Sequence, residues 1–101
     1  MPKKKNYMPK DISNFAHTIS GLTEVIGESF TTSSNDGRMV SWCDGSDGYF
    51  LTLILDDNGK VHATVMDHVE AIKTYSAIGY LRYHRINFEA FWEPEGVYLD
   101  S

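Results

Sequence analysis

The chain has 101 residues, of which 42% are hydrophobic and 13% aromatic, so it has the length and the apolar content of one folded domain. No apolar run approaches the roughly 20 residues of a membrane helix, and the single cysteine, Cys43, rules out an internal disulfide and is typical of a reducing cytoplasm. Four of the nine basic residues lie in the first ten positions, which hold no acid, so residues 11–101 carry five basic and 14 acidic side chains.

This uneven charge divides the chain into a flexible basic arm, residues 1–10, and a single α+β domain, residues 11–101. The arm contains four lysines and two prolines but no hydrophobic period, which is typical of an unstructured segment. The domain, with a net charge of −9, should repel nucleic acid at long range and attract basic surfaces.

Apolar residues after Asp11 recur at steps of three and four, which predicts a helix with one buried face. Their positions are Ile12, Phe15, Ala16, Ile19, Leu22, Val25, Ile26 and Phe30. Asp11 is the expected N-cap of this helix. The polar residues 31–38 that follow are predicted to form a loop.

Three segments rich in β-branched and aromatic residues, 38–43, 49–55 and 60–66, predict a three-stranded antiparallel meander. The clusters DGSDG and DDNG between them are predicted to be turns, because Asn, Asp and Gly tolerate the left-handed backbone that tight turns require. An EF-hand interpretation of DDNG fails because a lysine occupies the fifth position, where an oxygen ligand is needed. The clusters therefore predict turns and no metal site.

The turn in DDNG sets the register of the second hairpin. With a three-residue loop and a bulge at Gly59, all strongly apolar positions of both strands share one face, whereas a two- or four-residue loop divides them between faces. The bulged turn is therefore predicted. It leaves the opposite face of the sheet with Phe50, Thr52, Ile54, His62, Thr64 and Met66.

Residues 67–83 are predicted to form a second helix. Asp67, followed three residues later by Glu70, is typical of a capping box at a helix start. The apolar side of this helix is expected to consist of Val69, Ile72, Tyr75 and Ser76.

Gly79 leaves two interpretations of the residues that follow it. Either the helix continues to Tyr83, which is favoured, or it stops at Gly79 and residues 80–86 form a fourth strand. Residues 87–92 predict a short last helix that ends before Pro94. The predicted fold is a two-layer α+β domain with an N-terminal helix, a three-stranded antiparallel meander and C-terminal helices, in the order α-β-β-β-α-α.

Motifs that name a chemistry are absent from the sequence. No nucleophile signature surrounds Cys43. His62 and His68 are six residues apart, which is too wide for a typical zinc pair. There is also no glycine-rich phosphate loop. The sequence therefore predicts neither an enzyme nor a bound metal or cofactor.

The sheet face opposite the leucines of residues 49–55 is the predicted binding surface. A partly apolar face to which no helix is assigned is typical of a partner or dimer surface; the alternative is that the last helix covers it. Acidic turn residues should lie at both ends of this face. The predicted partner-binding residues are Asp36, Asp44, Asp47, Phe50, Ile54, Asp56, Asp57, His62 and Met66.

An apolar surface flanked by carboxylates suits a protein partner with a basic, nucleic-acid-binding surface. In its small size, acidity and aromatic content the chain resembles inhibitors carried by phages and mobile elements, and bacterial immunity proteins. That resemblance implies a cytoplasmic, non-enzymatic inhibitor of a nuclease toxin or of a nucleic-acid-handling defence complex. A second copy of the chain is the alternative partner, and no membrane is expected.

A nucleic-acid-binding regulator is the alternative function. Residues 80–85 mix aromatic side chains with Arg82 and Arg85, as single-strand binders do, and the lysine arm would add positive charge. Because two arginines make only a small patch on an acidic domain, direct binding of nucleic acid is the less favoured interpretation.

Overall fold

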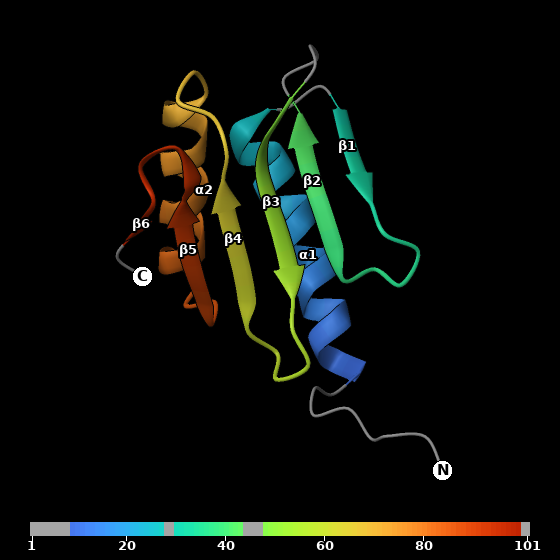
Figure 1. Ribbon diagram of the computed structural model, residues 1–101. Coiled ribbons are helices and arrows are strands. Elements are labelled where there is room, and N and C mark those ends of the chain that lie inside the picture. Colours follow the sequence, from blue (N-terminus) through green and yellow to red (C-terminus); the bar gives the residue numbers. More distant parts are fainter. Residues whose placement is uncertain (1–8, 28–29, 44–47, 100–101) are drawn as a thin grey trace.

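A sheet with two helices on one of its faces makes up the part of the chain that the computed structural model describes, residues 9–27, 30–43 and 48–99 (Figure 1). Within these residues the sheet has six strands in the order β1-β2-β3-β4-β5-β6. The helices α1 (Pro9–Ile26) and α2 (Ala71–Tyr83) both lie behind the sheet in Figure 1. The strands are β1 (Phe30–Ser33), β2 (Met39–Cys43), β3 (Tyr49–Leu55), β4 (Val61–Val65), β5 (Phe88–Trp92) and β6 (Val97–Leu99).

The predicted meander is present as β2, β3 and β4, which pair antiparallel in the centre of the sheet. Leu53 lies opposite Ala63 and Thr52 lies opposite Thr64, which is the register that the bulged turn predicts. Gly59 has a φ of 83°, a left-handed conformation that glycine adopts without strain. The expected α+β class and the hairpin register are therefore confirmed.

The residues after α1 form a strand, although the sequence predicted the end of a helix followed by a loop. The helix ends at Ile26, and the backbone N–H of Gly27 donates to the carbonyl of Thr23. Strand β1 then pairs antiparallel with the edge of β2. Pairing with that edge outweighs the weak local preference of a short Thr/Ser segment. At its other end, α1 begins at Pro9, so Asp11 lies in the first turn and is not the N-cap.

Helix α2 continues through Gly79 to Tyr83, as the favoured interpretation predicted, but its start and its buried side differ from expectation. Asp67 accepts a hydrogen bond from the backbone N–H of Val69, and the N-cap residue Glu70 makes no capping hydrogen bond with its side chain. The buried side consists of Thr74, Ala77, Ile78 and Leu81. The side expected to be buried is exposed instead, and its members are Val69, Ile72, Tyr75 and Ser76.

The segment predicted as a last helix is strand β5, which lies parallel to β4 because α2 crosses over between them. Its buried residues, Phe88, Ala90 and Trp92, alternate with half-buried Glu89 and Phe91, which is the period of a strand. A 3-10 turn, η1 (Glu93–Glu95), then leads into β6, which pairs antiparallel with β5. The three-stranded meander thus becomes the middle of a larger mixed sheet.

The core fills the space between the helices and the sheet. Trp42 in β2 is fully buried there, and its Nε1 donates to the hydroxyl of Thr23 in α1 (3.1 Å). The two helices touch at Gly21 of α1. The hydroxyl of Tyr80 in α2 lies so close there that a Cβ atom at this position would overlap it. A glycine inside α1 therefore serves the close approach of α2.

Candidate functional site

One face of the sheet has no described element over it, and this is the surface that the sequence predicted for partner binding. Both helices lie on the other side, so the face turned toward the viewer in Figure 1 is uncovered; we call it the open sheet face. Strand pairing arranges it in two rows that cross the sheet. One row is Met39, Ile54, His62 and Glu89, the other is Ser41, Thr52, Thr64, Phe91 and Tyr98, and Tyr49 and Met66 lie beyond the second row.

Four large apolar side chains give the open sheet face its hydrophobic part. They are Met39, Tyr49, Ile54 and Met66, and each exposes between 39% and 43% of its surface. The exposure is partial because cross-strand neighbours on a sheet lie about 5 Å apart and shelter one another. The result is a set of apolar groups held in fixed positions and still accessible to a partner.

The second row contributes hydroxyl groups and an aromatic pair. The hydroxyls of Ser41 and Thr52 are 2.9 Å apart and share a hydrogen bond. Phe91 and Tyr98 meet edge to face, with ring centroids 5.0 Å apart. A shallow hollow of about 250 Å³ lies between this pair and the side chains of Thr64 and His62. The second row therefore adds a shallow hollow and hydrogen-bonding groups to the open sheet face.

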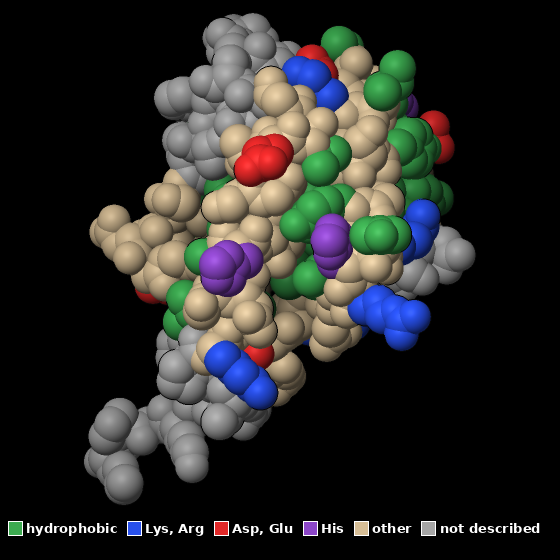
Figure 2. Space-filling model, turned by 180° about the vertical axis from the view of Figure 1, so that it is seen from behind, with side chains coloured by type: hydrophobic (Ala, Val, Ile, Leu, Met, Phe, Trp, Pro, Cys, Tyr) green, Lys and Arg blue, Asp and Glu red, His purple; other side chains and the backbone are tan. Residues whose placement is uncertain are grey.

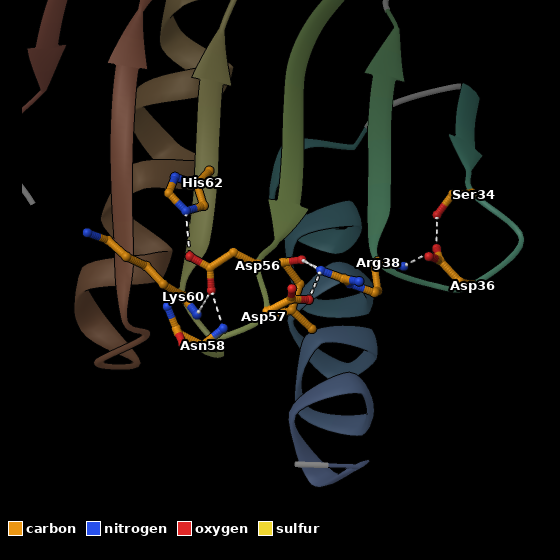
Figure 3. Close-up of polar contacts among 9 residues, drawn as sticks. Ser34, Asp36, Arg38, Asp56, Asp57, Asn58, Lys60 and His62 are labelled. Atoms are coloured by element: carbon orange, nitrogen blue, oxygen red, sulfur yellow. Dashed lines mark hydrogen bonds and ion pairs between the residues drawn. The ribbon is translucent and has the colours of Figure 1, made fainter. Parts of the chain in front are cut away.

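Asp56 organises the end of the face at the β3–β4 turn (Figure 3). Its carboxylate accepts hydrogen bonds from Nε2 of His62 (2.8 Å) and from the backbone N–H groups of Asn58 (2.8 Å) and Lys60 (2.9 Å). Partial burial opposes its ionisation, but the hydrogen bond from His62 and the two backbone donors together lower the pKa of Asp56 below its ordinary value. Asp56 is therefore a carboxylate at neutral pH and fixes the turn and the His62 ring together.

Arg38 links this turn to the neighbouring β1–β2 turn. Its guanidinium donates to the carbonyl of Leu55 (3.0 Å) and to the carboxylate of Asp57 (2.9 Å). In the β1–β2 turn, Asp36 accepts from the hydroxyl of Ser34 (2.6 Å) and from the backbone N–H of Arg38 (3.1 Å), and these bonds lower the pKa of Asp36 (Figure 3). The two turns are thus held as one polar unit.

The carboxylates at this end are only partly neutralised within the molecule. Lys60 pairs with Glu89 at 2.8 Å, and that contact lowers the pKa of Glu89 and raises the pKa of Lys60. Asp36 and Asp56, in contrast, are held mainly by hydroxyl, imidazole and backbone donors. This end of the open sheet face has four carboxylates, Asp36, Asp56, Asp57 and Glu89, against the two cations Arg38 and Lys60, and therefore keeps a net negative charge.

Eight of the nine predicted partner-binding residues fall into three groups by position. Those on the open sheet face are Ile54, His62 and Met66. Those in the turns at its end are Asp36, Asp56 and Asp57. Asp44 and Asp47 lie outside the described residues.

Phe50 is not on the open sheet face, and that part of the prediction is wrong. Trp42 pairs with Leu51 and Cys43 pairs with Tyr49, so Phe50 is the extra residue of a β-bulge. The bulge turns Phe50 to the helix side, where it is fully buried and the ammonium of Lys73 lies 5.7 Å from its ring centroid. Phe50 therefore belongs to the core.

Several residues of the open sheet face were not predicted. Glu89 and Phe91 come from β5, which was predicted to be a helix, and Tyr98 comes from β6, for which no element was predicted. Burial alternates along β5, but four of its five residues are apolar, so the sequence itself shows no clear period of two that could have identified the strand.

A cleft lies on the other side of the sheet, between the start of α1, the β3–β4 turn and the loop after α2. It has a volume of about 480 Å³. Its polar lining residues include Asp11, His17, His84 and Arg85, and the Tyr80 and His84 rings contact each other at a tilt of 44°, with centroids 4.2 Å apart. The cleft thus combines one acid, one arginine and aromatic side chains next to the first turn of α1.

Over residues 9–27, 30–43 and 48–99, no three His, Cys, Asp or Glu side chains are grouped so that they could hold a metal ion. Neither helix in these ranges has the length and hydrophobicity needed to cross a membrane. No known protein family, characterised protein or solved structure matches this chain.

Proposed function

We propose that the protein is a small, acidic, non-enzymatic binding protein that inhibits a basic, nucleic-acid-handling protein by docking through the open sheet face. The observation that carries the proposal is the pairing, on one uncovered face, of half-exposed apolar side chains with ionised carboxylates. The proposed partners are nuclease toxins and nucleic-acid-handling defence complexes of the cytoplasm. A single free cysteine is typical of proteins in that reducing compartment.

The apolar groups would supply most of the affinity. Met39, Ile54 and Met66 are large, partly exposed and held by neighbours on adjacent strands, so little conformational entropy is lost when a partner covers them. Interfaces gain most of their binding energy from a few such central contacts. The hydroxyl row beside them would give the complex its register.

The carboxylates would raise the rate of association and make binding selective for a basic partner. The lowered pKa values of Asp36 and Asp56 keep both groups charged across the neutral range. Fixed negative charge beside an apolar surface steers a basic partner into encounter and disfavours acidic ones. These carboxylates would occupy the surface of the partner that otherwise binds the phosphate groups of nucleic acid. The partner would be inhibited because nucleic acid could no longer bind there.

The test is affinity capture from an extract of the native host with the wild-type chain and two matched variants. Ile54→Lys places a charge in the centre of the open sheet face, and Ile72→Lys places the same charge on the exposed side of α2. The proposal predicts that a basic protein is retained by the wild type and by Ile72→Lys and is lost with Ile54→Lys. Retention by all three chains would refute docking through this face.

The salt dependence of association tests the electrostatic half separately. With the captured partner purified, the association rate constant should fall steeply as ionic strength rises, because steering between opposite charges is screened. A rate constant that does not change with salt would remove the carboxylates from the account and leave only the apolar contact.

One observation favours the nucleic-acid-binding regulator as a second candidate. Arg85, His84 and Tyr80 line the same cleft as Asp11, which directly follows Lys10 in the first turn of α1. A gel-shift assay with single-stranded nucleic acid, using the full chain, a chain lacking residues 1–8 and Arg85→Glu, tests this. The regulator predicts a shift that both changes abolish, and the inhibitor predicts no shift with any of the chains.

A further inference from the structure

The outer side of α2 carries an apolar stripe that the fold does not use. Ile72 exposes 84% of its surface and Tyr83 exposes 82%, and exposed Ser76 and Gly79 lie between them. These four residues, which we call the α2 stripe, follow one another at steps of four, three and four. Figure 2, which views the helix side of the molecule, shows hydrophobic side chains gathered along the edge where α2 lies.

This spacing is the one by which two helices pair side by side. The stripe has large side chains at its ends and small ones in the middle, so another helix could approach closely at its centre. A Cβ atom at Gly79 would meet nothing within 4 Å, which leaves that position open to a neighbour. Neither end residue packs against the hydrophobic core, so burial by another molecule would remove a large apolar area from water.

Charges along one flank of the stripe are arranged by sign. Tyr75 and Arg82 are seven residues apart on α2 and therefore lie on the same flank. Tyr75 stacks on Trp92, with ring centroids 5.3 Å apart, and the exposed acids Glu93 and Glu95 lie in the 3-10 turn that follows Trp92. The flank is thus acidic near the start of α2 and basic, through exposed Arg82, near its end.

We propose that a second copy of this chain binds to the α2 stripe, with the two α2 helices antiparallel about a twofold axis between Ser76 and Gly79. Such an axis places Ile72 of each copy against Tyr83 of the other and Ser76 against Gly79. It also brings the same flank of both copies together with the ends exchanged. Arg82 of each copy then meets Glu93 and Glu95 of the other.

The charges are the reason for choosing a second copy as the occupant. An isologous interface requires that the surface complement itself, and an acidic end and a basic end on one flank do so only in the antiparallel arrangement. Antiparallel helices also place opposite ends of their dipoles side by side, which adds to the same preference. In a parallel twofold pairing, the same flank of the two copies lies on opposite sides of the contact, so Arg82 would not meet Glu93 and Glu95.

The proposed dimer is independent of the proposed function. Helix α2 lies on the opposite side of the sheet from the open sheet face, so both copies keep that face accessible (Figure 1). The dimer would present two partner-binding surfaces on its outside. Failure of one proposal therefore leaves the other standing.

Sedimentation velocity of the full chain over a range of concentrations tests the dimer. The wild type should associate reversibly to a dimer, and Ile72→Asp should raise the dissociation constant at least about tenfold. The matched control Ile54→Lys, on the open sheet face, should change it less than about twofold. A wild type that stays monomeric up to about 1 mM, the weak limit of a measurable complex, overturns the proposal.

A charge exchange tests the antiparallel geometry itself. Arg82→Glu alone, and Glu93→Arg with Glu95→Arg alone, should each self-associate at least about tenfold more weakly, because like charges then face one another. An equimolar mixture of the two variants should recover the wild-type dissociation constant, since every contact across the axis again joins opposite charges. Circular dichroism establishes that both variants are folded. A mixture that associates no better than its components refutes this arrangement.

Discussion

The open sheet face and the α2 stripe are both apolar surfaces without a described covering element, but they are constructed differently. On the open sheet face, side chains of neighbouring strands shelter one another, and turn residues tie the charged end together. On the α2 stripe, Ile72 and Tyr83 stand about three helical turns apart with small residues between them. The first surface has the fixed, mixed chemistry that suits a different protein, and the second is complementary mainly to itself.

The largest expected effect separates the two faces of β3. Leu53 is fully buried against the helices, whereas its neighbour Ile54 lies on the open sheet face. Leu53→Ala should lower the free energy of unfolding by about 2–5 kcal/mol through lost burial and the cavity left behind. Ile54→Ala should lower it by less than about 1 kcal/mol. Urea denaturation measures both, and equal losses would mean that the open sheet face is covered.

The two buried tryptophans differ in the hydrogen bonding of their indole N–H groups. Trp42 donates its indole N–H to Thr23, whereas the N–H of Trp92 is buried with no hydrogen-bond partner among the described residues. Trp42→Phe loses a bond, and Trp92→Phe removes an unsatisfied donor, so the first should cost about 1–3 kcal/mol more stability than the second. Thermal and urea unfolding of both variants checks this. A larger loss with Trp92→Phe would show that its N–H is bonded in solution.

Asp56 makes the free energy of unfolding depend on pH. Its folded-state pKa is lowered, so its contribution to stability is present above the unfolded-state pKa of about 3.9 and is lost as the pH falls through the folded-state value. Asp56→Asn should cost about 1 kcal/mol at pH 7, and the difference from wild type should shrink below about pH 4. Urea midpoints at the two pH values measure it. A difference that grows in acid would contradict the sign.

The smallest expected effect lies on the α2 stripe. Ile72→Ala should change the free energy of unfolding of the monomer by less than about 0.5 kcal/mol, because the side chain is almost fully exposed. Ile78→Ala, on the buried side of the same helix, should cost about 2–5 kcal/mol and is the matched control. Denaturation at low protein concentration keeps dimerisation out of the measurement. Similar costs for both variants would place Ile72 in the core.

The parts of the fold that the sequence predicted are those with local signals. The β3–β4 hairpin follows from alternating apolar residues and from a glycine at the one position that needs a left-handed backbone. Strands β1, β5 and β6 are stabilised by pairing with strands elsewhere in the chain, and short segments carry little local evidence of such pairing. The prediction of three strands therefore captured β2, β3 and β4 and missed the strands that pair on either side of them.

The candidate site was predictable to the same degree. His62 and Ile54 were placed correctly because a period of two determines the face of each strand residue. Phe50 was misplaced because it belongs to a continuous apolar run, in which no alternation reveals that a bulge shifts one residue to the other face. For α2, both sides carry apolar residues, so the period alone could not decide which side the sheet covers.

Methyl NMR of the protein labelled at methionine and isoleucine tests the central claim most directly, because these residues mark both surfaces. On addition of the captured partner, the account predicts that the resonances of Met39, Ile54 and Met66 shift or broaden. Those of Ile72 on the α2 stripe and of Ile86 in the cleft should stay unchanged. Changes confined to Ile72 or Ile86 would contradict docking through the open sheet face.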